Sequence, residues 1–178
     1  HAEKTYEAVL RLGITTDTED ITGTVREERP VELTEQDFLD ILPEFRGEIQ
    51  QVPPMYSALK VDGRKLCDLA RQGKEVERKP RTVTIYQLEC LDLNGKTARL
   101  LVHCSKGTYI RTLCKDIGEA LGCGGCMEAL RRVTAGEYTA EEAVPLQELL
   151  DTDTPEAYLR PVDTMFRSHP TVTLTPNQ

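Results

Sequence analysis

The sequence contains no apolar run long enough to cross a bilayer, and no signal-peptide pattern opens it. Both absences argue against a membrane protein or a secreted one, so we expect a cytoplasmic location and no membrane partner. Internal repeats and low-complexity tracts are also absent. The 178 residues, of which 39% are hydrophobic and 29% charged, are enough for one ordinary globular domain with a buried core.

Metal-ligand patterns are almost absent as well. Cys123-Gly124-Gly125-Cys126 has the spacing of a zinc or redox motif, but there is no second CxxC or HxxxH, and the histidines at 1, 103 and 169 are scattered. A structural zinc site needs four ligands. We therefore predict no metal and interpret this motif as small residues packed in a turn between two helices. The six cysteines could form disulfides, but without a secretion signal reduced thiols are expected.

The net charge of −8 argues at first against a nucleic-acid partner, but the charge is unevenly distributed. Residues 42–132 hold 16 Lys and Arg against 11 Asp and Glu, whereas the rest of the chain has a balance of −13. The most cationic segment is Lys60–Arg81, with eight basic and four acidic residues. Binding follows the local field, so a basic middle can meet phosphate. Taken alone, however, the pattern is more typical of a solvated surface of mixed charge.

Hydrophobic periodicity predicts an α+β fold with a mixed, largely antiparallel sheet and flanking helices. The expected strands are 5–12, 82–93, 96–104, 133–139 and 171–174, with a hairpin turn at Asn94-Gly95 and a polar loop over 15–23. The expected helices follow Thr34 and cover residues 66–70, 110–121 and 127–130, with short helical pieces beyond Pro145.

The segment from Ser105 to Thr112 (SKGTYIRT) is the most informative for chemistry. A strand end followed by Lys106-Gly107-Thr108 at a helix start offers a cation and backbone N–H groups to an anion. Arg111 lies among apolar neighbours in that helix, so its guanidinium needs a carboxylate or phosphate partner. From this segment alone, a structural ion pair on a helix face is an equally good interpretation.

Two further candidates are weak by themselves. Tyr6 lies on the apolar face of the first strand, where an isolated tyrosine is typical of a packing residue. Arg131 and Arg132 follow Leu130, but paired arginines are common on protein surfaces.

Seven blocks of the sequence, in this order and spacing, resemble the bacterial tRNA pseudouridine-55 synthases of the T-loop-modifying (TruB) family. The likeness runs from Lys4 to about Phe166, nearly the whole chain. The blocks are Lys4–Tyr6 with Leu12-Gly13, Thr16–Gly23, Pro53–Lys60, Gly63–Leu66, Ala70–Gly73, Cys104–Thr112 and Leu130–Arg132.

The resemblance implies an RNA-modifying isomerase that converts a T-loop uridine of tRNA to pseudouridine, without cofactor or metal. In this family an essential aspartate acts on the glycosidic bond, and the arginine matching Arg111 pairs with it. The tyrosine matching Tyr6 stacks on the target base and is placed to assist loss of the C5 proton, and Leu130 matches an apolar wall of the pocket. Since the uridine must leave its stack, base flipping is expected.

The other candidate residues are assigned to substrate binding. Asp20 matches a family position at the active-site cleft, with its role left open. Residues 54–82 are expected to form a basic insertion that grips the tRNA. The expected substrate-binding residues are Asp20, Lys60, Lys65, Arg71, Lys106, Tyr109, Arg131 and Arg132.

One departure concerns the catalytic aspartate itself. In the family it lies in a Gly-x-Leu-Asp-x-x-Ala-x-Gly block upstream of the Tyr6 strand, and no such block occurs here. We expect residues 1–150 to be part of the catalytic domain, residues 151–178 to be a short helical connector to a missing RNA-binding PUA domain, and the chain alone to be inactive. No obligate protein partner is evident.

Two alternatives stay open. One is a non-catalytic RNA-binding or tRNA-folding module that keeps the family's surface. The other is the RNA-guided pseudouridine synthase of eukaryotes and archaea, which shares several of these blocks, although the compact spacing here favours the bacterial type.

Overall fold

The computed structural model describes residues 3–166 and 170, and the chain divides into two compact units between Gly136 and Glu137. The domain boundary near residue 150 that the sequence suggests stays a prediction. The strand expected at 171–174 lies outside the described residues.

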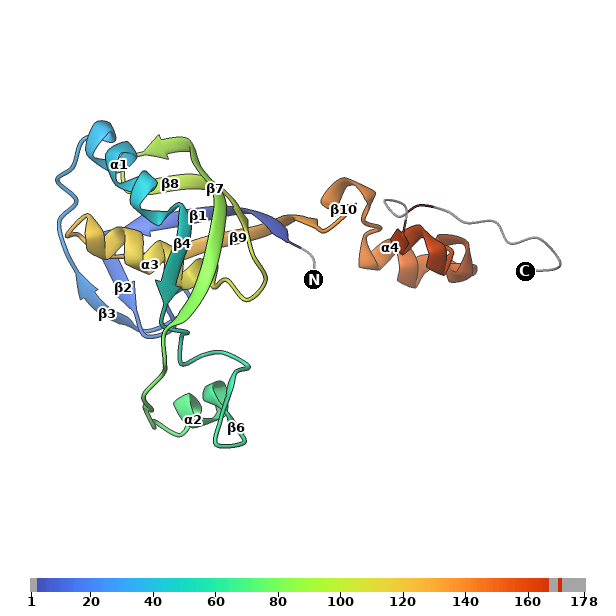
Figure 1. The fold of residues 1–178 in the computed structure, drawn as a ribbon, viewed down its shortest axis with the longest axis horizontal. Coiled ribbons are helices and arrows are strands. Elements are labelled where there is room, and N and C mark those ends of the chain that lie inside the picture. Colours follow the sequence, from blue (N-terminus) through green and yellow to red (C-terminus); the bar gives the residue numbers. More distant parts are fainter. Residues whose placement is uncertain (1–2, 167–169, 171–178) are drawn as a thin grey trace. The chain divides into compact units, whose positions relative to one another are not determined.

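The first unit contains five strands of the main sheet, in the order β9-β1-β8-β7-β4, with neighbouring strands antiparallel (Figure 1). These strands are β1 (Lys4–Leu12), β4 (Gly47–Gln51), β7 (Arg81–Asn94), β8 (Thr97–Cys104) and β9 (Gly125–Ala135). Two small sheets pair β2 (Ile14–Thr16) with β3 (Val25–Glu28) and β5 (Lys60–Val61) with β6 (Arg64–Lys65). The helices are α1 (Glu35–Ile41), the 3-10 turn η1 (Leu42–Phe45), α2 (Leu66–Arg71) and α3 (Ile110–Ala120). The predicted α+β class with a largely antiparallel sheet is confirmed.

The core lies between one face of this sheet and the helices α1 and α3. Alternate residues of β1 and β8 are buried there, as their period-two pattern predicts. The capping box of Thr34 and Asp37 starts α1, whose Phe38 is fully buried. The residues that the sheet and α3 contribute to the buried core cluster are Tyr6, Ala8, Leu10, Leu12, Ile85, Leu88, Ala98, Leu100, Val102, Cys104, Ile110, Leu113, Cys114 and Ile117.

The helix predicted at residues 127–130 is wrong, and the polar loop predicted at residues 15–23 is wrong in part. Residues 127–130 belong to β9 and form no helix, because they pair with β1 from Leu12↔Gly125 to Lys4↔Ala135. The apolar spacing of Met127 and Leu130 mimics a helix, but the long edge of β1 decides the structure. The polar loop expected from residue 15 begins later, because Thr15 and Thr16 pair with β3.

The Cys123–Cys126 turn joins a helix to a strand, and not two helices as predicted. Gly118 of α3 lies against it, since a Cβ atom there would be 2.4 Å from Gly124 C and 2.4 Å from Gly125 N. The Gly124 N–H also donates to Gly118 O at 2.8 Å. Small residues here allow α3 to approach the start of β9 closely.

The basic insertion (residues 54–82) forms a small lobe of β5, β6 and α2 between β4 and β7 (Figure 1). Asp62 and Gly63 both have positive φ, at 50° and 78°, as a tight two-residue hairpin turn requires. Arg78 Nη1 donates to the carbonyl of Pro53 at 3.1 Å, which ties the two ends of the lobe together.

The second unit contains only short elements in its described part. They are β10 (Tyr138–Thr139), η2 (Ala140–Glu142), α4 (Leu146–Asp151), η3 (Pro155–Tyr158) and η4 (Val162–Phe166), which confirms the short helical pieces predicted beyond Pro145. Among the described residues of the chain, none of the helices has the length and apolarity needed to cross a membrane.

Candidate active site

Arg111, in the first turn of α3, joins three segments of the chain. Its Nη1 donates to Thr18 O at 3.0 Å and to Asp20 Oδ2 at 3.2 Å, and its Nη2 donates to Tyr56 O at 2.7 Å. The side chain is only 21% exposed. The guanidinium thus has a carboxylate partner, as its apolar surroundings require, and it connects α3 to the β2–β3 loop and to the basic insertion.

The Asp20 carboxylate is held by its own loop as well as by Arg111. Oδ1 accepts from Thr18 Oγ1 at 2.9 Å and from the Thr22 N–H at 3.1 Å, and also from the Thr22 hydroxyl. Burial alone would raise the pKa of Asp20, but the hydrogen bonds from Thr22 and Thr18 and the charge of Arg111 outweigh it and hold this pKa below its ordinary value. Asp20 is therefore ionised at neutral pH.

The β2–β3 loop is hydrogen-bonded to the start of β9. The Ile21 N–H donates to Met127 O at 2.9 Å, and the Met127 N–H donates to Glu19 O at 3.0 Å. These bonds place Asp20 beside Met127 of β9, and Met127 precedes Leu130 by three residues.

Tyr6, Leu130 and Arg132 share the sheet face that carries α3. Tyr6 lies opposite Arg132 and Ala8 opposite Leu130, and directly opposed residues of antiparallel strands point to the same face. The guanidinium carbon of Arg132 lies 5.4 Å from the centroid of the Tyr6 ring. Leu130 is 44% exposed although Ala8 beside it is buried. The apolar side chain of Leu130 is therefore open to solvent on the face of the sheet that carries the Tyr6 ring.

The structure separates the two adjacent arginines. Arg131 lies opposite Glu7, on the face of the sheet away from α3, because successive residues of a strand alternate. Only Arg132 shares the face of Tyr6 and Leu130.

Gln51 fixes the start of α3, although no sequence pattern points to this residue. This residue, at the end of β4, is 1% exposed, and its side-chain amide donates to Tyr109 O at 3.1 Å and accepts from the Tyr109 N–H at 3.0 Å. One N–H that the SKGTYIRT segment was expected to offer an anion is thus already bonded. Lys106 lies exposed in the preceding turn.

The cations predicted in the basic insertion are exposed. Lys60 lies directly opposite Lys65 in the β5–β6 hairpin. Arg71, at the end of α2, is 74% exposed and lies 3.7 Å from Asp68. A hollow of about 540 Å³ adjoins the hairpin, lined by Lys60, Gly63, Arg64, Lys65, Asp68, Leu69 and Gln72.

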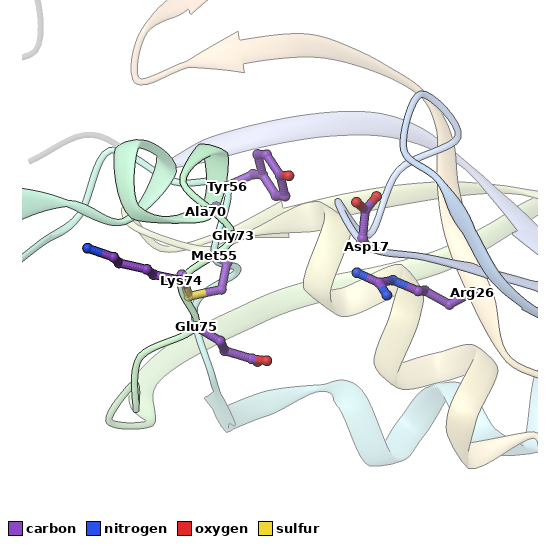
Figure 2. A pocket seen from close by; sticks show the side chains of 8 residues that line it. All are labelled: Asp17, Arg26, Met55, Tyr56, Ala70, Gly73, Lys74 and Glu75. Atoms are coloured by element: carbon purple, nitrogen blue, oxygen red, sulfur yellow. The ribbon is translucent and has the colours of Figure 1, made fainter.

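A second pocket, of about 360 Å³, is lined in part by Tyr56, whose carbonyl accepts from Arg111. Figure 2 shows Asp17 and Arg26 on one side of it and residues of the basic insertion, including the Tyr56 ring, on the other. The pocket is therefore bounded by the same two segments that Arg111 connects. Its lining residues are Asp17, Arg26, Met55, Tyr56, Ala70, Gly73, Lys74 and Glu75.

Glu19 is a second residue that the sequence analysis missed. It is 9% exposed, and its carboxylate accepts from Thr112 Oγ1 at 2.7 Å and from Lys115 Nζ at 3.1 Å. In the sequence it is one acid among the turn formers of a polar loop, so nothing indicates its contact with a helix more than ninety residues away.

The described residues hold no group of three or more His, Cys, Asp or Glu side chains that could bind a metal ion. Burial raises the pKa of Cys126 to about 11, and it also raises the pKa of Cys123.

Comparisons with known proteins identify the family of the chain. Residues 1–110 match the TruB family pseudouridylate synthase (N-terminal domain), and residues 111–167 match the tRNA pseudouridylate synthase B C-terminal domain. The chain is 51% identical over 173 residues to tRNA pseudouridine synthase B of Dechloromonas aromatica, covering 96% of this chain and 58% of the relative. It is 56% identical over 148 residues to the protein of that name from Pseudomonas fluorescens, covering 83% of this chain and 48% of the relative. The chain thus spans about half the length of the curated relatives it matches.

Solved structures with a similar fold include a Cbf5–Nop10–Gar1 complex, with 29% identity and a TM-score of 0.62 over 85% of this chain and 36% of that one. Another is an H/ACA RNP bound to a substrate RNA containing 2′-deoxyuridine, with 25% identity and a TM-score of 0.58 over 89% of this chain and 37% of that one. With family models matching almost its whole length, the chain belongs to the TruB family of pseudouridylate synthases.

Proposed function

We propose that the full-length protein converts a uridine in the T stem-loop of tRNA, at position 55, to pseudouridine in the cytoplasm. The observation that carries the proposal is the pairing of Arg111 with Asp20 beside a sheet face that carries the buried Tyr6 and the exposed Leu130, in a chain about half identical to tRNA pseudouridine synthases. The relatives, which are named as tRNA pseudouridine synthases, support the location.

The reaction needs the uracil to detach from C1′, turn, and rejoin the ribose through C5, with loss of the C5 proton. Leu130 offers an apolar wall to a flat base, and Tyr6 offers a ring on which it can stack. Arg111 has the charge and the geometry to orient a carboxylate, and the essential one belongs to the sequence block that these 178 residues lack. Because the exposed Arg132 lies over the Tyr6 ring, we propose that Arg132 moves to a phosphate when the base stacks there.

The basic insertion is proposed to hold the tRNA backbone. Like charges directly opposite each other destabilise a two-stranded ladder, and Lys60 faces Lys65 in such a ladder. A phosphate group beside the hollow at this hairpin would relieve their repulsion. Contacts of this kind position an RNA without reading its sequence.

The test is pseudouridine formation by the full-length protein on a T stem-loop RNA, scored by carbodiimide-stop primer extension. We expect one new stop, at the T-loop uridine, and none in an RNA with cytidine at that position. The 178 residues alone should form no product, because they lack the catalytic block. Tight binding by the full-length protein with no product would instead favour the non-catalytic RNA-binding or tRNA-folding module.

A further inference from the structure

Two consecutive acids of the β2–β3 loop meet two consecutive residues of α3. Asp20 pairs with Arg111, and Glu19 accepts a hydrogen bond from the neighbouring Thr112, which is fully buried. Lys115, one turn further along the helix, donates to the other oxygen of Glu19. The loop is thus joined to the helix by two adjacent contacts. The contact of Asp20 with Arg111 belongs to the candidate site, and the contact of Glu19 with Thr112 and Lys115 lies next to it along the chain.

The backbone of Glu19 is what lets both acids face the helix. In an extended chain, successive side chains point in opposite directions. Glu19 has φ of 65°, in the left-handed region that residues other than glycine, asparagine and aspartate rarely adopt. Such a conformation persists only where surrounding contacts hold it. Here the contacts include the backbone bonds of Glu19 to Thr16 and Met127. The Glu19 side chain adds the buried hydrogen bond from Thr112 and the ion pair with Lys115, in which the Glu19 carboxylate is 11% exposed.

We propose that Glu19 is a positioning residue, which anchors the β2–β3 loop to α3 and so holds Asp20 in register with Arg111. The proposal rests on the proposed function, because the site that it serves is the one assigned above. Glu19 itself touches no reacting group. Its effect passes through the direction of the Asp20 carboxylate and through the Thr18 carbonyl, both of which receive hydrogen bonds from Arg111.

The test compares three variants of the full-length protein. Glu19→Ala removes the charge and both hydrogen-bond acceptors, whereas Glu19→Gln removes the same charge and keeps an oxygen for Thr112. Glu119→Ala is the matched control, because Glu119 is another carboxylate of this region, 44% exposed and paired with Arg29. The measurements are the single-turnover rate of pseudouridine formation, the Kd for tRNA, and the pKa of the Asp20 carboxyl by NMR.

For Glu19→Ala we expect a rate at least about tenfold lower, a Kd within about twofold of wild type, and a higher pKa of Asp20 than in Glu19→Gln. Both variants lose the same negative charge. The difference between their Asp20 pKa values therefore reports only a change in the position of the Asp20 carboxylate relative to Arg111. Glu19→Gln should retain the rate within about threefold, and Glu119→Ala should match wild type.

Equal rates and equal Asp20 pKa values in the Ala and Gln variants would overturn the positioning role. A wild-type protein that forms no pseudouridine would instead refute the proposed function, and the pKa comparison would still decide the role of Glu19. If Glu19→Ala does not fold, Thr112→Val removes the donor with little change of shape. Thr112→Val should lower the rate and raise the pKa of Asp20, as expected for Glu19→Ala. Wild-type values of both quantities in Thr112→Val would also refute the proposal.

Discussion

Replacing Arg111 with lysine keeps a positive charge but removes the planar group that reaches three oxygens. The guanidinium donates to the carbonyls of Thr18 and Tyr56 and to the Asp20 carboxylate, from two different nitrogens. A lysine ammonium is a single point charge and cannot reproduce this spread. Hydrogen bonds to charged groups contribute about 1.5–3 kcal/mol each. Loss of one such bond, if it is needed to keep the site in its reactive geometry, should therefore cost about 2.7 kcal/mol, or a hundredfold in rate.

The assay is single-turnover pseudouridine formation by the full-length Arg111→Lys protein, below its melting temperature. Affinity for tRNA should stay within a few-fold, because phosphate contacts dominate binding. The melting temperature should fall by a few degrees, since two partly buried carbonyls lose a donor.

The control is Arg29→Lys, because Arg29 also bridges two acids, Glu27 and Glu119, on an exposed part of the first unit. It should leave the rate unchanged. An Arg111→Lys protein with normal turnover and only a lower melting temperature would show that Arg111 forms a structural ion pair and has no role in the reaction.

Three other predictions follow from the charges and thiols. Changing both Lys60 and Lys65 to Ala should weaken tRNA binding and make the log–log salt dependence of Kd shallower by roughly one to two units, and an unchanged slope would place the RNA elsewhere. Asp20→Asn should lower the melting temperature at neutral pH. Because the folded-state pKa of Asp20 lies below its ordinary 3.8, its contribution to stability is present above about pH 4 and is lost as the pH falls through that lower value. The melting temperatures of the two proteins should therefore converge in acid, and a constant difference would contradict this. Elemental analysis should find no stoichiometric zinc, and zinc that disappears when Cys123 and Cys126 are both changed to Ser would refute the packing interpretation.

The parts of the fold that sequence analysis predicted well are those that local chemistry decides. The alternation of β1 follows from one buried face, and the β7–β8 hairpin follows from Asn94-Gly95, whose glycine has φ of 59°. The capping box at Thr34 predicts the start of α1 from two side chains three residues apart. Each of these signals lies within a few residues of the structure that it specifies.

The start of β9 shows where local reasoning fails. Residues 127–130 have apolar spacing that fits a helix, yet they extend a strand because β1 presents a long unpaired edge to them. That edge lies more than a hundred residues earlier in the chain, and the β2–β3 loop adds further bonds at Met127. A tertiary partner of this length outweighs a weak local preference.

The candidate site could likewise be predicted only in part from the sequence, and Arg111 shows why. The sequence could say that its guanidinium needs an anionic partner, but its three acceptors lie 93, 91 and 55 residues away. Two of them are backbone carbonyls, which any residue type supplies and which therefore leave no pattern to read. Only Asp20 carries a side chain specific to the contact, and a family motif pointed to it without giving its role. It follows that the Tyr56 side chain can change with little effect on Arg111, whereas the Thr18 side chain also matters because its hydroxyl holds the Asp20 carboxylate. A shift of the Thr18 or Tyr56 backbone, by loss of the Glu19 anchor or movement of the basic insertion, withdraws the carbonyl acceptors.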